Sequence, residues 1–97
     1  MKVKELLYKE AKWTQRTRAR TFFGHYRCEP RSILARQWCL TGAIEKCYPY
    51  ANPSELSEIC DRIRKHLPRG RSSLVQWNDQ EDTTFADVQA LLEKADV

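Results

Sequence analysis

Glycine is scarce in this chain, with only three residues among 97. Loops that cradle phosphate need closely spaced glycines, and neither G-x-G-x-x-G nor G-x-x-x-x-G-K-[ST] occurs. The H-E-x-x-H motif of zinc proteases and the G-x-S-x-G nucleophile elbow are missing as well. These absences disfavour the common nucleotide-binding and hydrolytic enzymes, and we expect a protein that is not an enzyme.

The chain also lacks the paired cysteines of a structural zinc site. Its four cysteines, Cys28, Cys39, Cys47 and Cys60, follow one another at steps of 11, 8 and 13 residues. Structural zinc ligands usually come in close pairs, so we expect no metal and no cofactor. The thiols are expected to be reduced and to serve as small apolar side chains of the core.

Long apolar runs are missing too. No segment approaches the roughly 20 apolar residues that a membrane-spanning helix needs, and residues 1–12 lack the apolar stretch of a signal peptide. Hydrophobic residues make up 41% and charged residues 31%, which is ordinary for a globular protein. We expect one cytoplasmic domain over residues 1–97, with no membrane contact.

Positive charge is concentrated in the first half of the chain. Residues 1–49 hold eleven Lys and Arg against four Glu, whereas residues 50–97 hold six against nine Asp and Glu. The densest stretch, residues 12–36, is called here the basic aromatic segment because Trp13, Phe22, Phe23 and Tyr26 lie among its arginines. Arginine with aromatic side chains is typical of RNA or single-stranded DNA binding, and a solvated face with core aromatics is the alternative.

Helical patterns cover much of the sequence. Apolar spacing predicts helices over residues 2–12 and 32–47, the second being the most buried. Two more helices have a capping box at their start, formed by Asn52 with Glu55 and by Thr84 with Asp87.

The remaining segments are predicted to be extended or irregular. Threonines and aromatics around Gly24 favour a short β-hairpin within residues 13–28, with an irregular basic loop as the alternative. Residues 74–77 are expected to be extended, and residues 78–82 to form a loop. The predicted fold is a mostly α-helical α+β domain, with about four helices and a short β-hairpin or extended segment after the first.

Three short tryptophan motifs occur in order along the chain: Trp13–Gln15 (W-T-Q), Trp38–Ala43 (W-C-L-T-G-A) and Trp77–Asp79 (W-N-D). With the amphipathic helix after Thr84, they resemble a family of small bacterial and bacteriophage domains of unknown function. That family usually has a hairpin containing Gly and Asp where residues 16–26 of this chain are rich in Arg and Phe. The resemblance implies a shared helical fold and residence on a mobile or phage-derived element, and it implies no activity.

The strongest candidate for a catalytic nucleophile is Cys39, with His25 or His66 as base and Asn78 or Asp79 as orienting group. The predicted position of Cys39 in mid-helix argues against this small enzyme, because no helix N-terminus would activate the thiol there. Asn78 and Asp79 are instead expected to fix their own loop through hydrogen bonds to the backbone.

Three residues of the tryptophan motifs are expected to hold the core together. Trp38 and Trp77 are large apolar anchors, and Gly42 is expected to allow a neighbouring helix or Trp77 to approach closely. A larger side chain at Gly42 should therefore destabilise the protein.

The function that these patterns favour is docking on a macromolecule. The residues expected to contact the partner are Arg16, Arg18, Arg20, Phe22, Phe23, Tyr26, Arg27 and Arg31. The partner is either the acidic face of a protein, as for a phage-encoded inhibitor of host defence, or nucleic acid. The oligomeric state does not follow from the sequence.

Overall fold

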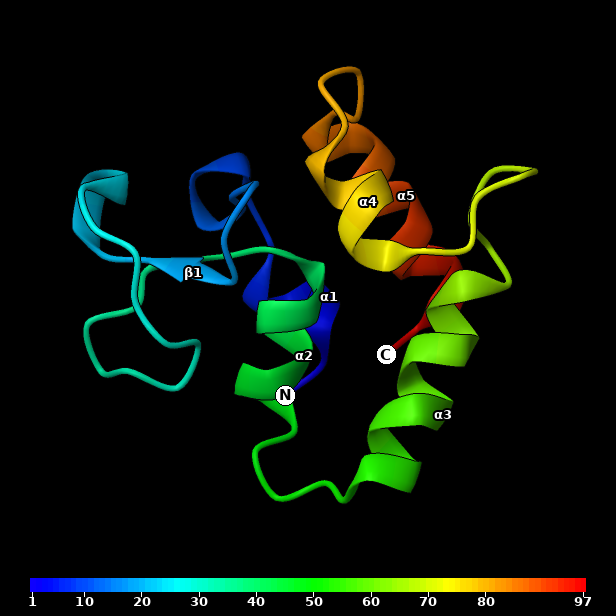
Figure 1. Ribbon diagram of the computed structural model, residues 1–97, viewed down its shortest axis with the longest axis horizontal. Coiled ribbons are helices and arrows are strands. Elements are labelled where there is room, and N and C mark those ends of the chain that lie inside the picture. The colour runs from blue at the N-terminus through cyan, green and yellow to red at the C-terminus, as the bar shows by residue number, and fades with distance from the viewer.

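The computed structural model describes residues 1–97 as short helices around one core, with a small sheet at one side (Figure 1). In chain order the elements are α1 (Val3–Leu6), the 3-10 turn η1 (Glu10–Lys12), β1 (Ala19–Arg20), the 3-10 turn η2 (Phe22–Gly24), β2 (Gln37–Trp38), α2 (Leu40–Cys47), α3 (Pro53–Arg64), α4 (Leu74–Asp79) and α5 (Phe85–Ala95). The predicted class, a mostly helical α+β domain, is confirmed. No helix is both long enough and apolar enough to span a bilayer.

The two capping boxes lie where the sequence predicts them. In α3 the Asn52 side chain accepts from Glu55 N at 2.8 Å, and Glu55 accepts from Asn52 N at 3.4 Å. In α5 Thr84 and Asp87 exchange the same pair of bonds, at 3.2 and 2.9 Å. Each box satisfies backbone N–H groups that the helix itself leaves unpaired, so these starts are determined locally.

The prediction of a helix over residues 32–47 is wrong for its first half. Helix α2 begins only at Leu40, because the preceding residues pair with β1 in an antiparallel register of Ala19 with Trp38 and Arg20 with Gln37. The hairpin predicted within residues 13–28 is present in reduced form: an isolated antiparallel bridge joins Arg20 to Arg27, with backbone bonds from Thr21 N to Tyr26 O at 2.8 Å and from Cys28 N to Ala19 O at 3.1 Å. The strand that pairs with β1 in the sheet is β2.

Two further predictions are corrected. The helix expected over residues 2–12 is broken into α1 and η1, with non-helical backbone from Leu7 to Lys9. Residues 74–79, expected to be extended and then a loop, form α4, whose start is capped by Ser73 Oγ accepting from Gln76 N at 3.2 Å. A six-residue helix is too short to show a clear apolar period, which is why pattern analysis misses it.

The core joins all five helices. α2 packs against α1 and α4, while α5 packs against α1 and α3. The largest fully buried side chains include Leu7, Leu40, Ile44, Ile63 and Leu92. Burial of this one cluster is the main stabilising term of the fold.

The two ends of the chain are tied together on one side of this core. Val3 N donates to Val97 O at 2.8 Å, and the Lys2 and Lys4 ammonium groups lie 2.6 and 2.8 Å from Asp96 Oδ1. Hydrogen bonds from both lysines lower the pKa of Asp96 from 3.8 to about 2. Asp96 itself is left-handed, at φ 52°, which ends α5.

This terminal contact predicts an acid-sensitive part of the stability. Because the pKa of Asp96 is depressed in the folded protein, its contribution is present above about pH 4 and is lost as the pH falls through about 2. Asn tolerates the left-handed conformation, so Asp96→Asn removes only the charge. We expect this variant to lose less stability than the parent between about pH 4 and pH 2 in urea denaturation series. Equal losses in the two proteins would contradict the account.

Candidate functional site

The first and third tryptophan motifs meet at the side chain of Asn78. Its Oδ1 accepts from Trp13 Nε1 at 2.8 Å and from Leu40 N, the first residue of α2, at 3.1 Å. Its Nδ2 donates to Thr14 O at 3.2 Å and to Asp79 Oδ1 at 2.9 Å. One buried amide thus connects η1, the chain that follows it, α2 and α4.

The neighbouring residues extend this connection. Gln15 Nε2 donates to the carbonyl oxygens of Asn78 and Gln80, at 2.8 and 2.9 Å. Asp79 Oδ1 accepts from Arg16 N at 2.8 Å, and Arg16 has the left-handed φ of 68°. Asn78 and Asp79 therefore do fix backbone, but the backbone of residues 14–16 and 40 rather than a loop of their own.

Gly42 lies against the backbone of Arg18, just before β1, and its closest approach is not to a helix or to Trp77, so that expectation is corrected. A Cβ at this position would lie 1.9 Å from Arg18 O and 2.8 Å from Arg18 C. The same Arg18 carbonyl oxygen accepts from Cys39 N at 3.1 Å. Only glycine lets α2 approach the chain before β1 this closely.

Cys39 is the N-cap of α2 rather than a mid-helix residue, and this too is a correction. Its Sγ accepts from Gly42 N at 3.4 Å and lies 3.3 Å from Thr41 Oγ1, and the residue is 5% exposed. The hydrogen bonds of Sγ do not include His25, which follows η2, or His66, which follows α3. Beside this buried sulfur the structure assembles no base.

The other three cysteines are half-buried free thiols. Burial raises the pKa of Cys47 to about 11, and it raises the pKa of Cys28 and Cys60 as well. No three Cys, His, Asp or Glu side chains lie close enough together to hold a metal ion.

Arg18 and Arg20 of the basic aromatic segment bond to other side chains within the protein. Arg18 forms ion pairs with Glu29 at 2.8 Å and Glu45 at 3.1 Å. Arg20 Nε donates to Thr14 Oγ1 at 2.9 Å and its Nη2 to the carbonyl oxygen of Gln15 at 3.3 Å. These two side chains hold the segment in place.

The other arginines are exposed. Arg16, Arg27 and Arg31 make no side-chain hydrogen bond or ion pair within the protein. Arg36, also exposed, donates from Nη1 to the carbonyl oxygens of Ile33 and Ala35, at 2.7 and 2.8 Å.

The aromatic rings predicted to contact a partner are exposed to solvent. The backbone of residues 22–26, between blue and cyan in Figure 1, lies on the side of the molecule away from α3. Phe22, Phe23 and Tyr26 are 61%, 75% and 74% exposed, so the alternative of core aromatics is wrong for these three. The Phe22 and Phe23 ring centroids lie 3.9 Å apart, and Phe23 has a left-handed φ of 58°.

A groove of about 390 Å³ runs beside the two phenylalanines. Its charged lining residues are Lys9, Lys12 and Arg36, and no carboxylate lines it. Sequence reasoning missed Lys9 as a site residue because a continuous helix over residues 2–12 placed it on an ordinary solvated face. The break before η1 brings Lys9 and Lys12 next to η2.

Comparison with known proteins places the chain in a family. It matches no curated protein and no solved structure. A family model described as a family of unknown function, DUF6197, matches residues 1–96. This covers nearly the whole chain and agrees with the resemblance to small domains of unknown function. The chain belongs to the family of unknown function DUF6197.

Proposed function

We propose that this protein is a non-enzymatic binding module that docks on single-stranded nucleic acid through Phe22, Phe23 and the cations beside them. The observation that carries the proposal is an exposed pair of phenylalanine rings beside a groove whose charged residues are all positive. Single-stranded nucleic acid offers the complement of both features, because it has unpaired bases to stack and phosphates to bind cations.

The conformation of Phe23 supports a role in binding. A residue other than glycine in the left-handed region is strained by on the order of 1–3 kcal/mol, and such strain concentrates at functional sites. The Phe23 side chain is 75% exposed, so burial in the core does little to offset this cost. A base stacked on the ring would offset it, since such stacking contributes about 1–3 kcal/mol per base.

The charges favour nucleic acid over a protein partner. Lys9, Lys12 and Arg36 line the groove, and Arg27 is exposed on the basic aromatic segment. Arg18 and Arg20 were expected to contribute, but their internal contacts give them the role of support. A groove whose charged lining residues are all cations suits the uniform charge of a phosphate backbone better than the mixed charges of most protein surfaces.

Fluorescence anisotropy with labelled single-stranded DNA and RNA, in a series of salt concentrations, tests the proposal. We expect roughly micromolar binding at low salt, with a log–log salt slope of about −2 from three phosphate contacts. Lys12→Gln should make the slope shallower by about 0.7. Lys65→Gln, at the residue that follows α3 and outside the groove, is the matched control and should leave the slope unchanged.

The phenylalanine is tested with a variant that relieves strain. Phe23→Asn should weaken binding about tenfold or more through loss of stacking, while raising Tm because Asn tolerates the left-handed conformation. Tyr50→Ala, which removes a ring that is 97% exposed outside the segment, should leave affinity unchanged.

Two results would contradict the proposal. One is the absence of any oligonucleotide binding at low salt. The other is binding only to an acidic polypeptide such as polyglutamate, which is the behaviour expected of a phage-encoded inhibitor that docks on an acidic host protein.

A further inference from the structure

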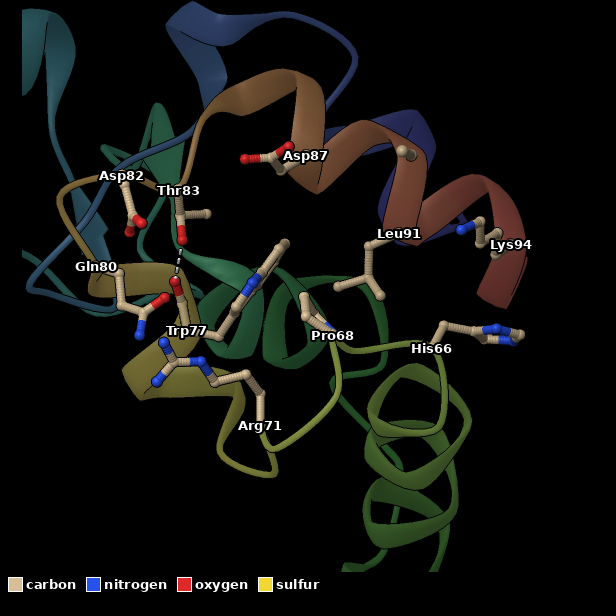
Figure 2. Close-up of a pocket in the computed structure, with 11 residues that line it drawn as sticks. His66, Pro68, Arg71, Trp77, Gln80, Asp82, Thr83, Asp87, Leu91 and Lys94 are labelled. Carbon is tan, nitrogen blue, oxygen red and sulfur yellow. Dashed lines mark hydrogen bonds between the residues drawn. The ribbon is translucent and has the colours of Figure 1, made fainter.

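A second cavity, of about 360 Å³, lies between α4, α5 and the turn after α3 (Figure 2). Its volume is within the range of about 300–1,000 Å³ that is usual for sites of small ligands. It shares no residue with the groove beside Phe22 and Phe23. Trp77 of α4 projects into it, and Pro68, Ala90 and Leu91 complete its apolar wall.

The Trp77 indole offers an unused hydrogen-bond donor to this cavity. The indole nitrogens of Trp13 and Trp38 donate to Asn78 Oδ1 and to Pro30 O, at 2.8 and 2.9 Å, whereas Trp77 Nε1 has no partner. No fully buried side-chain nitrogen or oxygen lacks a partner, so Trp77 Nε1 retains access to solvent. Trp77 is otherwise buried, which leaves the cavity as the place where that access exists.

Opposite charges line the cavity without pairing. Asp82 lies toward one end, Lys94 and His66 lie at the other, and the Trp77 ring lies between them (Figure 2). Arg71 also lines the Asp82 end, where its guanidinium faces the side-chain amide of Gln80 (Figure 2). None of these groups takes part in an ion pair of the protein. Asp87 adds a second carboxylate; one of its oxygens caps α5 by accepting from Thr84 N, and the other makes no hydrogen bond.

The spacing of these charges sets the length of a complementary ligand. Asp87 and Lys94 are seven residues apart on α5, which is two turns and about 10 Å along the axis. Helical side chains lean toward the N-terminus, so the Lys94 ammonium comes several ångströms closer. A free amino acid is too short for this gap, whereas an extended dipeptide spans roughly 7 Å.

We propose that this cavity binds a short peptide with free ends, of two or three residues. Asp82 and Asp87 bind the terminal ammonium group, and Lys94 binds the terminal carboxylate. Trp77 Nε1 donates to a carbonyl oxygen between them, while apolar side chains pack on Pro68, Ala90 and Leu91. The inference is independent of nucleic-acid binding, because it uses no residue before His66.

The indole signal of Trp77 in ¹⁵N-edited NMR spectra of the full chain reports binding directly. Titration with dileucine should shift this signal, with a Kd of roughly millimolar or tighter. N-acetyl-dileucine and dileucine amide each remove one terminal charge and should bind at least tenfold more weakly. Free leucine, whose charges are too close together, should be weaker by a similar factor.

Substitutions in the protein test the same contacts as the changes in the ligand. Lys94→Gln should weaken dileucine about tenfold, and should abolish the difference between dileucine and its amide. Lys65→Gln, a lysine of the same charge outside the cavity, should do neither. The proposal is overturned if dileucine at about 10 mM leaves the Trp77 signal unshifted, or if the blocked dipeptides bind as tightly as the free one.

Discussion

The Asn78→Ala variant is expected to lose about 3–5 kcal/mol of unfolding free energy. Truncation leaves Trp13 Nε1, Leu40 N and Thr14 O without the partner that satisfies them in the folded protein. A buried polar group without a hydrogen bond costs about 1–3 kcal/mol, and Leu40 and Thr14 are both buried. The Tm should fall by about 15–30 °C, and urea denaturation would measure the loss of unfolding free energy directly.

Asn78→Asp is the matched control for size. One carboxylate oxygen can still accept from Trp13 and Leu40, but the other then faces Thr14 O and Asp79 Oδ1, both of which are acceptors. The charged form is therefore disfavoured in the folded protein, which raises the pKa of the new carboxyl. The stability of the Asn78→Asp protein should increase as the pH falls toward about 4, because a protonated carboxyl oxygen can donate a hydrogen bond to Thr14 O or Asp79 Oδ1. Parental stability of Asn78→Asp at neutral pH would show that the amide is not required.

The Gly42→Ala variant is expected to lose about 3 kcal/mol or more. Alanine is the better helix former by about 1 kcal/mol, so an isolated helix would gain from this change. Here the new Cβ would lie 1.9 Å from Arg18 O, and either α2 or the chain before β1 must move. Such a movement breaks the hydrogen bond from Cys39 N to Arg18 O, which holds the N-terminus of α2 against the chain before β1.

Thr41→Ala controls for adding alanine to the same helical turn. Thr41 is half-buried and its side chain makes one hydrogen bond, with Cys39 Sγ, so we expect a loss of about 1 kcal/mol or less. The Tm values of Gly42→Ala, Thr41→Ala and the parent protein, measured by thermal melting, give the comparison. If Gly42→Ala has the same Tm as the parent, the close approach of α2 to Arg18 does not require glycine at position 42.

Local signals make part of the fold predictable from the sequence. The starts of α3 and α5 depend on side chains that bond to backbone three residues away, so a short stretch of chain contains the whole interaction. Ser73 gives a similar signal for α4, with Gln76 three residues later, but the neighbouring β-branched Val75 and aromatic Trp77 favoured an extended segment. Tertiary packing overrides this local preference, and the segment is helical.

The start of α2 could not be predicted in this way. Ile33 and Leu34 have the spacing of a buried helical face, yet both are exposed. Backbone pairing with β1 removes residues 36–39 from the helix, through bonds such as Arg36 N to Arg20 O. This pairing joins positions 17 and 19 residues apart, and no local pattern contains it. The cap is Cys39, which is outside the set of residues that usually begin helices.

The candidate site was predictable by composition and not by geometry. Basic and aromatic residues of the segment drew attention to Phe22, Phe23 and Tyr26, and these three are exposed. The roles of the arginines could not be distinguished, because only the fold brings Glu29 and Glu45 to Arg18. Lys9 and Lys12 line the groove because the helix breaks before η1, and the apolar spacing of the sequence does not indicate that break.

The Asn78 connection explains how so short a segment keeps its shape. Residues 13–16 are held by Asn78 and Asp79, and Arg20 is held in turn by Thr14 and Gln15. The backbone that leads to Phe22 is thus bonded to α4, which lies more than 50 residues later in the sequence. A site held in advance of binding loses less entropy when a ligand arrives.

Mapping backbone amide shifts in ¹⁵N-edited NMR spectra, as a single-stranded oligonucleotide is added, tests the central claim most directly. Docking at the groove predicts shifts at residues 9–12, 22–27 and 36–37, with the α3 helix unchanged. The basic residues Arg62, Arg64, Lys65, Arg69 and Arg71 form the competing positive region. Shifts confined to that region, or none at low salt, would contradict the claim.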